Sequence, residues 1–193
     1  MVGLGNPGRQ YAPTRHNVGF RVLEVLCRRW SAEAPRKAFG GRLWEARPAR
    51  PEAGTRRVVL LEPHTYMNRS GLAVRQVTDF YKAELRDVLI VLDDMNLPPG
   101  RLRVRAGGSA GGQKGLADVM EKLGSSQVPR LRIGIGRPPP SMDDVDFVLT
   151  RFRKDEEEIV AGAVQTAADA VEDWVFGGLA SVMETYNRKP DND

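Results

Sequence analysis

The chain has little cysteine and little histidine, and it has no long apolar run. Cys27 is the one cysteine among 193 residues, so no disulfide can form within the chain. With that thiol and two imidazoles, His16 and His64, a zinc site would need carboxylates for most of its ligands, so we expect no bound metal. No segment reaches the roughly 18 apolar residues of a membrane span, and no basic-then-apolar secretory signal opens the chain. These absences predict a cytoplasmic protein without a membrane partner.

Positive charge is in slight excess. The formal net charge is +4, and 23 of the 29 basic residues are arginine. Arginine makes bidentate contacts with phosphate and stacks on bases, which lysine cannot do. The excess fits an RNA partner, and a bias in genome composition explains it equally well. A length of 193 residues suits a single domain, which we place at residues 1–187, followed by a polar tail at 188–193.

The spacing of apolar residues predicts strands that alternate with helices. Four features stand out. A helix at 72–81 follows the candidate N-cap Ser70, and a strand at 88–92 is apolar enough to be buried on both faces. A strand at 101–105 is half exposed, and two glycines interrupt a long helix at 155–187. We expect strands at 1–4, 42–46, 57–61, 88–92, 101–105 and 131–136, and helices at 18–30, 72–81, 116–123 and 155–187 with a break at 177–178. This alternation predicts an α/β fold, in which a mixed sheet is sandwiched between helices.

His16 stands on the loop between the first predicted strand and the first predicted helix. The ordinary pKa of histidine allows proton transfer near neutral pH, and α/β proteins often place chemistry on such loops. His16 is therefore the candidate general base. His64, next to Pro63, is interpreted as a surface or packing residue.

Asn6, Asn68 and Asp93 each follow a predicted strand. If those strands are parallel, the three side chains meet at one edge of the sheet, beside the His16 loop. A carboxylate there can orient an imidazole, and amides can stabilise an oxyanion. Simpler interpretations remain open, namely a turn residue for Asn6, a helix cap for Asn68 and a turn carboxylate for Asp93.

Two glycine-rich segments resemble nucleotide-binding loops without matching them. The segment 3–8 has the G-x-G-x-x-G spacing, but Pro7 and Pro13 interrupt the place where a helix would have to begin, which disfavours a dinucleotide-binding oxidoreductase. The segment 107–115 lacks the Gly-Lys-Ser/Thr ending of a P-loop. We interpret it as a mobile lid or as a backbone nest for anions.

Taken together, these segments resemble the bacterial-type peptidyl-tRNA hydrolases, and the similarity covers nearly the whole chain. The matching segments fall in family order: the opening VGLGNPG with Tyr11 and Thr14 to Asn17, Thr65 to Gly71, Asp93 with Leu97 to Gly100, the loop 107–115, 130–136, 147–149 and the C-terminal helix with Trp174. The resemblance implies a monomer of one domain, a three-layer sandwich with a twisted mixed sheet.

The resemblance also implies an activity and residue roles. The activity is hydrolysis, without a cofactor, of the ester between a peptide and the 3′ end of tRNA, which recycles tRNA from stalled translation. The substrate is bound through its acceptor arm. By position, His16 matches the catalytic base, Asp93 its partner and Asn6 the residue that senses a blocked amine. Positions that match substrate contacts are Tyr11, Asn17, Tyr66, Asn68 and Lys114, and positions that match tRNA contacts are Arg103, Arg105 and Arg132.

The chain departs from the family pattern in its glycine-rich loop. Gln113 and Lys114 stand where the family usually has histidine and asparagine. Lysine donates hydrogen bonds but cannot accept them, so we expect its charge to serve an oxyanion or a tRNA phosphate. The change keeps open a second hypothesis, a non-catalytic RNA-binding relative of the same family. The chain also begins unusually close to its first strand, which suggests a clipped N-terminus.

Overall fold

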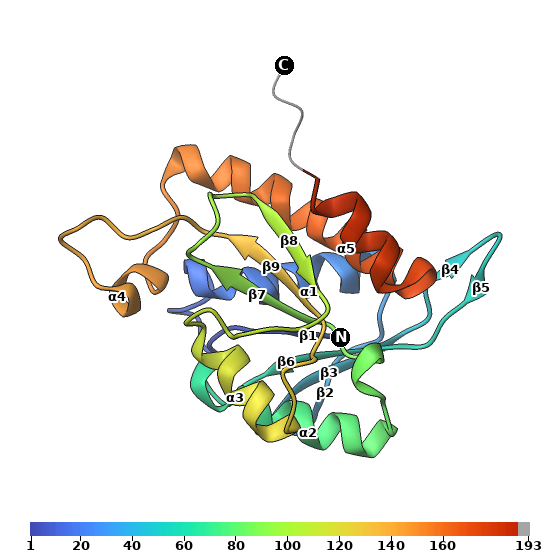
Figure 1. Ribbon diagram of the computed structural model, residues 1–193. Helices are drawn as coiled ribbons and strands as arrows, with labels where there is room; N and C mark the ends of the chain where they lie inside the picture. Colours follow the sequence, from blue (N-terminus) through green and yellow to red (C-terminus); the bar gives the residue numbers. More distant parts are fainter. Residues whose placement is uncertain (189–193) are drawn as a thin grey trace.

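The computed structural model describes residues 1–188, which form a seven-stranded mixed sheet with helices on both faces (Figure 1). In spatial order the strands are β2 (Arg36–Ala38), β3 (Gly41–Ala46), β6 (Val58–Pro63), β1 (Val2–Gly3), β7 (Ile90–Asp94), β9 (Arg130–Gly134) and β8 (Leu102–Arg105). A hairpin of β4 (Ala49–Arg50) and β5 (Gly54–Thr55) projects between β3 and β6. The predicted mixed sheet is confirmed.

The central strands share one direction. β6, β1, β7 and β9 pair in parallel, whereas β3 runs antiparallel to β6 and β8 runs antiparallel to β9. The carboxyl ends of the four parallel strands therefore lie at one edge of the sheet, where α/β proteins bind ligands. The segments that follow β1, β6 and β7 begin side by side at this edge.

Helices cover both faces of the sheet. α1 (Val18–Arg29) and α5 (Lys154–Tyr186) pack on one face, and α2 (Ser70–Tyr81) and α3 (Lys114–Leu123) pack on the other (Figure 1). The short α4 (Asp144–Val148) lies apart from these layers. Val91 belongs to the first core, and Ile90 and Leu92 belong to the second, so β7 is buried on both faces, as its apolar run predicts. No helix within residues 1–188 is long and apolar enough to cross a membrane.

Element boundaries differ slightly from the predictions. Asp93 and Asp94 are the last two residues of β7 rather than the start of a turn. Ser70 is the first residue of α2 and its hydroxyl donates to the Met67 carbonyl, so the prediction of Ser70 as N-cap was wrong. The predicted break in the last helix is confirmed at Gly178, which has φ 80° and ψ 176°. Within the predicted polar tail, residues 189–193 lie outside the described part of the chain.

A close backbone contact places α1 against the sheet. A Cβ atom on Gly19, in the first turn of α1, would lie 2.5 Å from the carbonyl oxygens of Leu4 and Val91. That separation is shorter than any carbon–oxygen contact in a relaxed structure. Because glycine lacks this atom, α1 starts directly over the ends of β1 and β7. The 3-10 turn η1 (Arg15–Asn17), which carries His16, is thereby held at the carboxyl edge.

A buried arginine fixes the other side of the same turn. Arg15 is 4% exposed and is bonded to the segment that leads into α5. Its guanidinium contacts the Thr150 hydroxyl, the Ile135 carbonyl, the Glu156 carboxylate and the rings of Phe147 and Phe152. Burial works to raise the pKa of Glu156, but hydrogen bonds from Arg15 and the Arg153 amide outweigh burial and lower that pKa below its ordinary value.

We predict that Gly19→Ala destabilises the protein by about 3 kcal/mol, because the added methyl group must push α1 away from β1 and β7. Thermal unfolding followed by circular dichroism measures the change. Gly162→Ala is the matched control, since a Cβ there has no neighbour within 4 Å and α5 is helical at that point. This control should gain about 0.5–1 kcal/mol. Equal effects of the two substitutions would contradict the close contact.

We predict that Arg15→Met costs about 3–5 kcal/mol near neutral pH, because it leaves the Glu156 carboxylate largely buried without its main partner. In the parent protein the lowered pKa of Glu156 adds stability above the ordinary carboxyl range, and this stability is lost as the pH falls through the folded-state pKa. The deficit of the variant should therefore shrink under acid conditions, as Glu156 becomes protonated.

Urea denaturation at neutral and at acid pH tests this prediction. Arg153→Met is the control, because Arg153 also faces Glu156 but is 72% exposed, and exposed pairs contribute about 1 kcal/mol or less. A deficit in Arg15→Met that did not change with pH would mean that its other contacts, and not the carboxylate, carry the effect.

Candidate active site

A cavity of about 490 Å³ opens at the carboxyl edge of the sheet. Its size lies within the range of small-molecule sites. The short helix α4 and the residue that follows it form an apolar wall with Val145, Val148 and Leu149. Of the side chains singled out from the sequence, seven line this cavity: Asn6, His16, Tyr66, Asn68, Asp93, Lys114 and Arg132. The predicted convergence of residues behind β1, β6 and β7 is therefore present.

His16 and Asp93 form a hydrogen-bonded pair on the wall of this cavity. The distance between His16 Nδ1 and Asp93 Oδ2 is 2.7 Å, and the side chains are 12% and 2% exposed. Because a carboxylate accepts hydrogen bonds, Nδ1 carries the proton and Nε2 is the basic nitrogen of the neutral ring. His16 is thus oriented to accept a proton at Nε2.

The other oxygen of Asp93 is bonded to a residue to which the sequence analysis gave no role. Gln113 Nε2 donates to Asp93 Oδ1 at 2.9 Å. Gln113 also serves as the N-cap of α3, since its Oε1 accepts from the Leu116 amide at 2.7 Å. The signal in the sequence was the departure from the family pattern at Gln113, which stands beside the departure at Lys114.

Asn6 is held in place by two neighbours. Asn17 brackets the Asn6 backbone, accepting from its N–H at 2.9 Å and donating to its carbonyl at 2.9 Å. Asn6 Oδ1 accepts from the Met67 amide at 2.8 Å. The Oδ1 end of the Asn6 amide is thus engaged, which leaves Nδ2 as its donor toward the cavity. Asn17 is 2% exposed and does not line the cavity, and the contacts that the structure shows for it are those that position Asn6; the expected substrate contact of Asn17 stays a prediction.

Tyr66 stands on the cavity wall in a strained backbone conformation. Its φ is 60° and its ψ is 155°, a region that non-glycine residues rarely adopt. Such strain costs about 1–3 kcal/mol and is often stored at functional sites. The turn presents the Tyr66 ring at 54% exposure and places Asn68 at the mouth of the cavity.

Two arginines of β9 hold the glycine-rich loop. Arg130 is fully buried and donates to the carbonyls of Gly108, Ser126 and Val128. Its burial, together with the charge of Arg132, lowers the pKa of Arg130 to about 10. Arg132 donates to Asp94 at 3.0 Å and to the Ser109 carbonyl at 2.8 Å. The start of the loop, at Gly108 and Ser109, is therefore attached to β9.

The other side chains singled out from the sequence, besides Asn17, lie outside the cavity wall. Tyr11 does not line the cavity, and its carbonyl accepts from the Thr14 hydroxyl. Arg103 and Arg105 are exposed on the edge strand β8. Arg103 pairs in register with Arg132 of β9, so both belong to the same face of the sheet. His64 is exposed, is bonded to the buried carboxylate of Glu62 and does not line the cavity, in line with its interpretation as a surface or packing residue.

The described residues offer no ready metal site. Within residues 1–188, no group of three or more His, Cys, Asp and Glu side chains is arranged to hold an ion. The arrangement instead supplies an oriented imidazole, a buried carboxylate and several amide and ammonium donors around one cavity. Such a set can activate water and stabilise an oxyanion.

Comparison with known proteins agrees with this chemistry. The family model described as peptidyl-tRNA hydrolase matches residues 1–193. The peptidyl-tRNA hydrolases of Rhodopirellula baltica and Syntrophomonas wolfei are 47% and 44% identical to it over 187 residues, covering 97% of this chain and 96% and 98% of theirs. The crystal structure of peptidyl-tRNA hydrolase from Acinetobacter baumannii superposes with a TM-score of 0.88 at 34% identity, over 96% of this chain and 92% of that one. The chain belongs to the peptidyl-tRNA hydrolase family.

Proposed function

We propose that this chain hydrolyses the ester bond between a peptide, or an N-blocked aminoacyl group, and the 3′-terminal ribose of tRNA. The observation that carries the proposal is the 2.7 Å hydrogen bond between His16 Nδ1 and the buried carboxylate of Asp93. This bond leaves Nε2 as a base on the wall of the cavity. The family of the relatives supplies the substrate class.

In the proposed mechanism, His16 Nε2 takes a proton from a water molecule as the water oxygen attacks the ester carbonyl carbon. Asp93 stabilises the imidazolium that forms. The tetrahedral intermediate carries its negative charge on the former carbonyl oxygen. When it collapses, the bond to the ribose oxygen breaks, the imidazolium returns its proton to that oxygen, and the peptide leaves as a carboxylic acid. No cofactor is needed for this sequence.

Donors around the cavity are suited to the oxyanion and to the substrate. Asn68 and Lys114 line the wall near the dyad, and Lys114 is the first residue of α3. A cation at a helix N-terminus is disfavoured by the helix dipole, which fits a role for Lys114 in binding an anionic group of the substrate. Asn6 offers Nδ2 to the carbonyl beside a blocked amine, and Tyr66 offers its exposed ring to the terminal nucleotide or the peptide.

The acceptor arm of tRNA is proposed to bind along β8 and the glycine-rich loop. Arg103 and Arg105 are exposed there and supply phosphate contacts. The Nη atoms of Arg132 donate hydrogen bonds to the Asp94 carboxylate and the Ser109 carbonyl. We therefore propose that Arg132 positions the glycine-rich loop and also belongs to the surface that binds tRNA. We propose that the protein acts as a monomer in the cytoplasm, where peptidyl-tRNA arises. Tyr11 stands outside the cavity wall, and we assign it a contact only with a longer substrate.

The non-catalytic RNA-binding alternative is not favoured. A protein that only binds RNA has no use for a buried carboxylate bonded to the imidazole on a cavity wall. The relatives that match nearly the whole chain are hydrolases by name. The substitutions at Gln113 and Lys114 leave this dyad in place.

We predict that His16→Ala lowers the hydrolysis rate of N-acetylaminoacyl-tRNA by about 10²–10⁴-fold, because the general base is lost. The affinity for tRNA should change little, since phosphate contacts dominate it. Release of the labelled N-acetylamino acid measures the rate.

His64→Ala is the matched control. The His64 side chain is 38% exposed and bonded to Glu62, outside the cavity, so its loss should leave the rate within about twofold of the parent. Near-parent turnover in His16→Ala would reject His16 as the base. Tight tRNA binding without any hydrolysis by the parent would favour the RNA-binding alternative instead.

We predict that tRNA binding weakens as salt rises, with a log–log slope of about −0.7 to −0.9 for each neutralised phosphate. The double substitution of Arg103 and Arg105 by alanine should make the slope shallower by about 1–2, since two phosphate contacts are lost. Binding of deacylated tRNA, measured by fluorescence anisotropy across a salt series, gives both slopes.

The control is Arg86→Ala. Arg86 is 78% exposed and lies in the turn η3 (Leu85–Asp87) before β7, outside β8 and away from the cavity wall. It should leave the slope unchanged. The same slope in the double variant and the parent would rule out β8 as the tRNA contact.

A further inference from the structure

We infer that Gln113 is a positioning residue for the His16–Asp93 pair, acting through Asp93 and not on the substrate. The inference rests on the proposed role of His16 as the base. Asp93 is 2% exposed, and each of its oxygens has one side-chain donor, His16 Nδ1 at 2.7 Å and Gln113 Nε2 at 2.9 Å. A carboxylate bonded on both oxygens cannot rotate, so the direction in which it holds the imidazole is set by both partners.

The orientation of the Gln113 amide follows from its neighbours. The Leu116 N–H lies 2.7 Å from one end of the amide and can only donate, so that end must be Oε1. The NH₂ group is then turned toward Asp93, and it also lies 3.2 Å from the Met67 sulfur. The cap of α3 and the bond to Asp93 thus depend on the same side chain in the same orientation.

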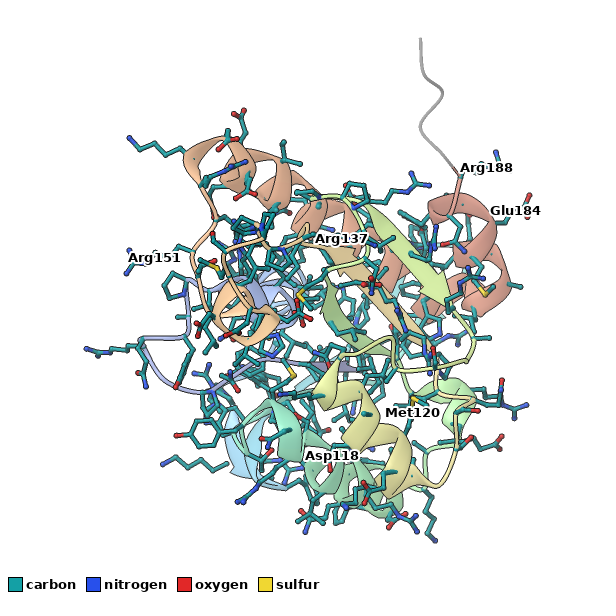
Figure 2. The ribbon with its side chains drawn as sticks, turned by 60° about the vertical axis from the view of Figure 1, so that its left-hand side comes forward. Asp118, Met120, Arg137, Arg151, Glu184 and Arg188 are labelled. Atoms are coloured by element: carbon teal, nitrogen blue, oxygen red, sulfur yellow. The ribbon has the colours of Figure 1, made fainter. Side chains whose placement is uncertain are left out.

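The place of Gln113 is fixed by the packing of α3. Asp118 on α3, labelled in Figure 2, accepts from the Gly71 amide of α2 at 2.6 Å. A Cβ on Gly71 would overlap the Asp118 backbone, so the two helices touch at this point. Because α3 is held against α2 and Gln113 is the N-cap of α3, Gln113 meets Asp93 at a defined distance.

The amide also suits the protonation chemistry. It donates to Asp93 without carrying a charge and without titrating, so it adds no positive charge that would compete with His16 for the carboxylate. The other charged groups that face the pair from the cavity wall are Asp94 with its partner Arg132, Lys114 and Asp144. Among the described contacts, none of these groups bonds to Asp93 or Gln113.

Two variants separate the bond to Asp93 from the helix cap. Gln113→Ser keeps a side-chain acceptor at the N-cap, where serine is favoured, but it is too short to reach Asp93. Gln113→Glu also keeps an acceptor for the Leu116 amide, and it places a second carboxyl group against Asp93. Since the cap survives in both variants, any fall in their unfolding temperature reports the changed contact with Asp93, namely a lost donor in Gln113→Ser and two facing carboxyl groups in Gln113→Glu.

In Gln113→Ser we expect kcat to fall by about tenfold to a hundredfold, with KM for N-acetylaminoacyl-tRNA little changed, because the base is misaligned and not the substrate. Asp93, having lost a donor, should bind the imidazolium more tightly. The acidic limb of the pH–rate profile should therefore move to higher pH, and the ratio of variant to parent rate should fall as the pH falls.

In Gln113→Glu we expect the opposite trend. Two facing carboxyl groups share a proton under acid conditions, and the protonated form donates to Asp93 as glutamine does. The ratio of variant to parent rate should therefore rise as the pH falls. A residue that served only to cap α3 would give neither trend.

His16→Ala is run beside these variants to keep two failures apart. If His16→Ala retains activity, the proposed base is wrong. If His16→Ala is inactive while Gln113→Ser keeps the parent kcat and an unshifted profile, the positioning role of Gln113 is overturned. Equal, pH-independent losses in the serine and glutamate variants would also overturn it, because they would show a structural effect alone.

Discussion

The site depends on one buried carboxylate. Asp93 ends the central strand β7 with 2% of its side chain exposed, and an ionised group in such a place must be hydrogen-bonded. Its partners come from distant parts of the chain, His16 from the turn before α1 and Gln113 from the cap of α3. Helices α1 and α3 pack on opposite faces of the sheet (Figure 1). The hydrogen bonds of Asp93 therefore connect segments from both helical layers at the carboxyl edge.

The scaffold around this carboxylate is built to leave His16 little freedom. Gly19 lets α1 touch the ends of β1 and β7, and Arg15 bonds the same turn to the segment before α5. On the other side of the cavity, Tyr66 keeps a positive φ that costs free energy and that the neighbouring bonds of Met67 help to maintain. Rigid support of this kind is what general-base catalysis needs, since small displacements of the base reduce the rate steeply.

Much of this arrangement could be predicted from the sequence, because it follows from periodicity and strand direction. The apolar run at 88–92 predicts a strand buried on both faces, and the parallel pairing of β6, β1 and β7 brings Asn6, Asn68 and Asp93 to one edge. The choice of hydrogen-bond partners could not be predicted in this way. Asn17 brackets Asn6, Arg132 bonds to Asp94, and Gln113 reaches Asp93. These contacts join segments that are distant in the sequence or belong to loops and turns, so they depend on how the elements pack in three dimensions and not on periodicity.

The most direct test of the account is the tautomer of His16. The chain has two histidines, so a sample with ¹⁵N-labelled histidine gives two sets of imidazole signals, and His64→Gln assigns them. Neutral His16 is expected to carry its proton on Nδ1, bonded to Asp93, and to have a bare Nε2. A neutral His16 with its proton on Nε2 would contradict the account, because the nitrogen proposed to accept the proton of water would already be occupied.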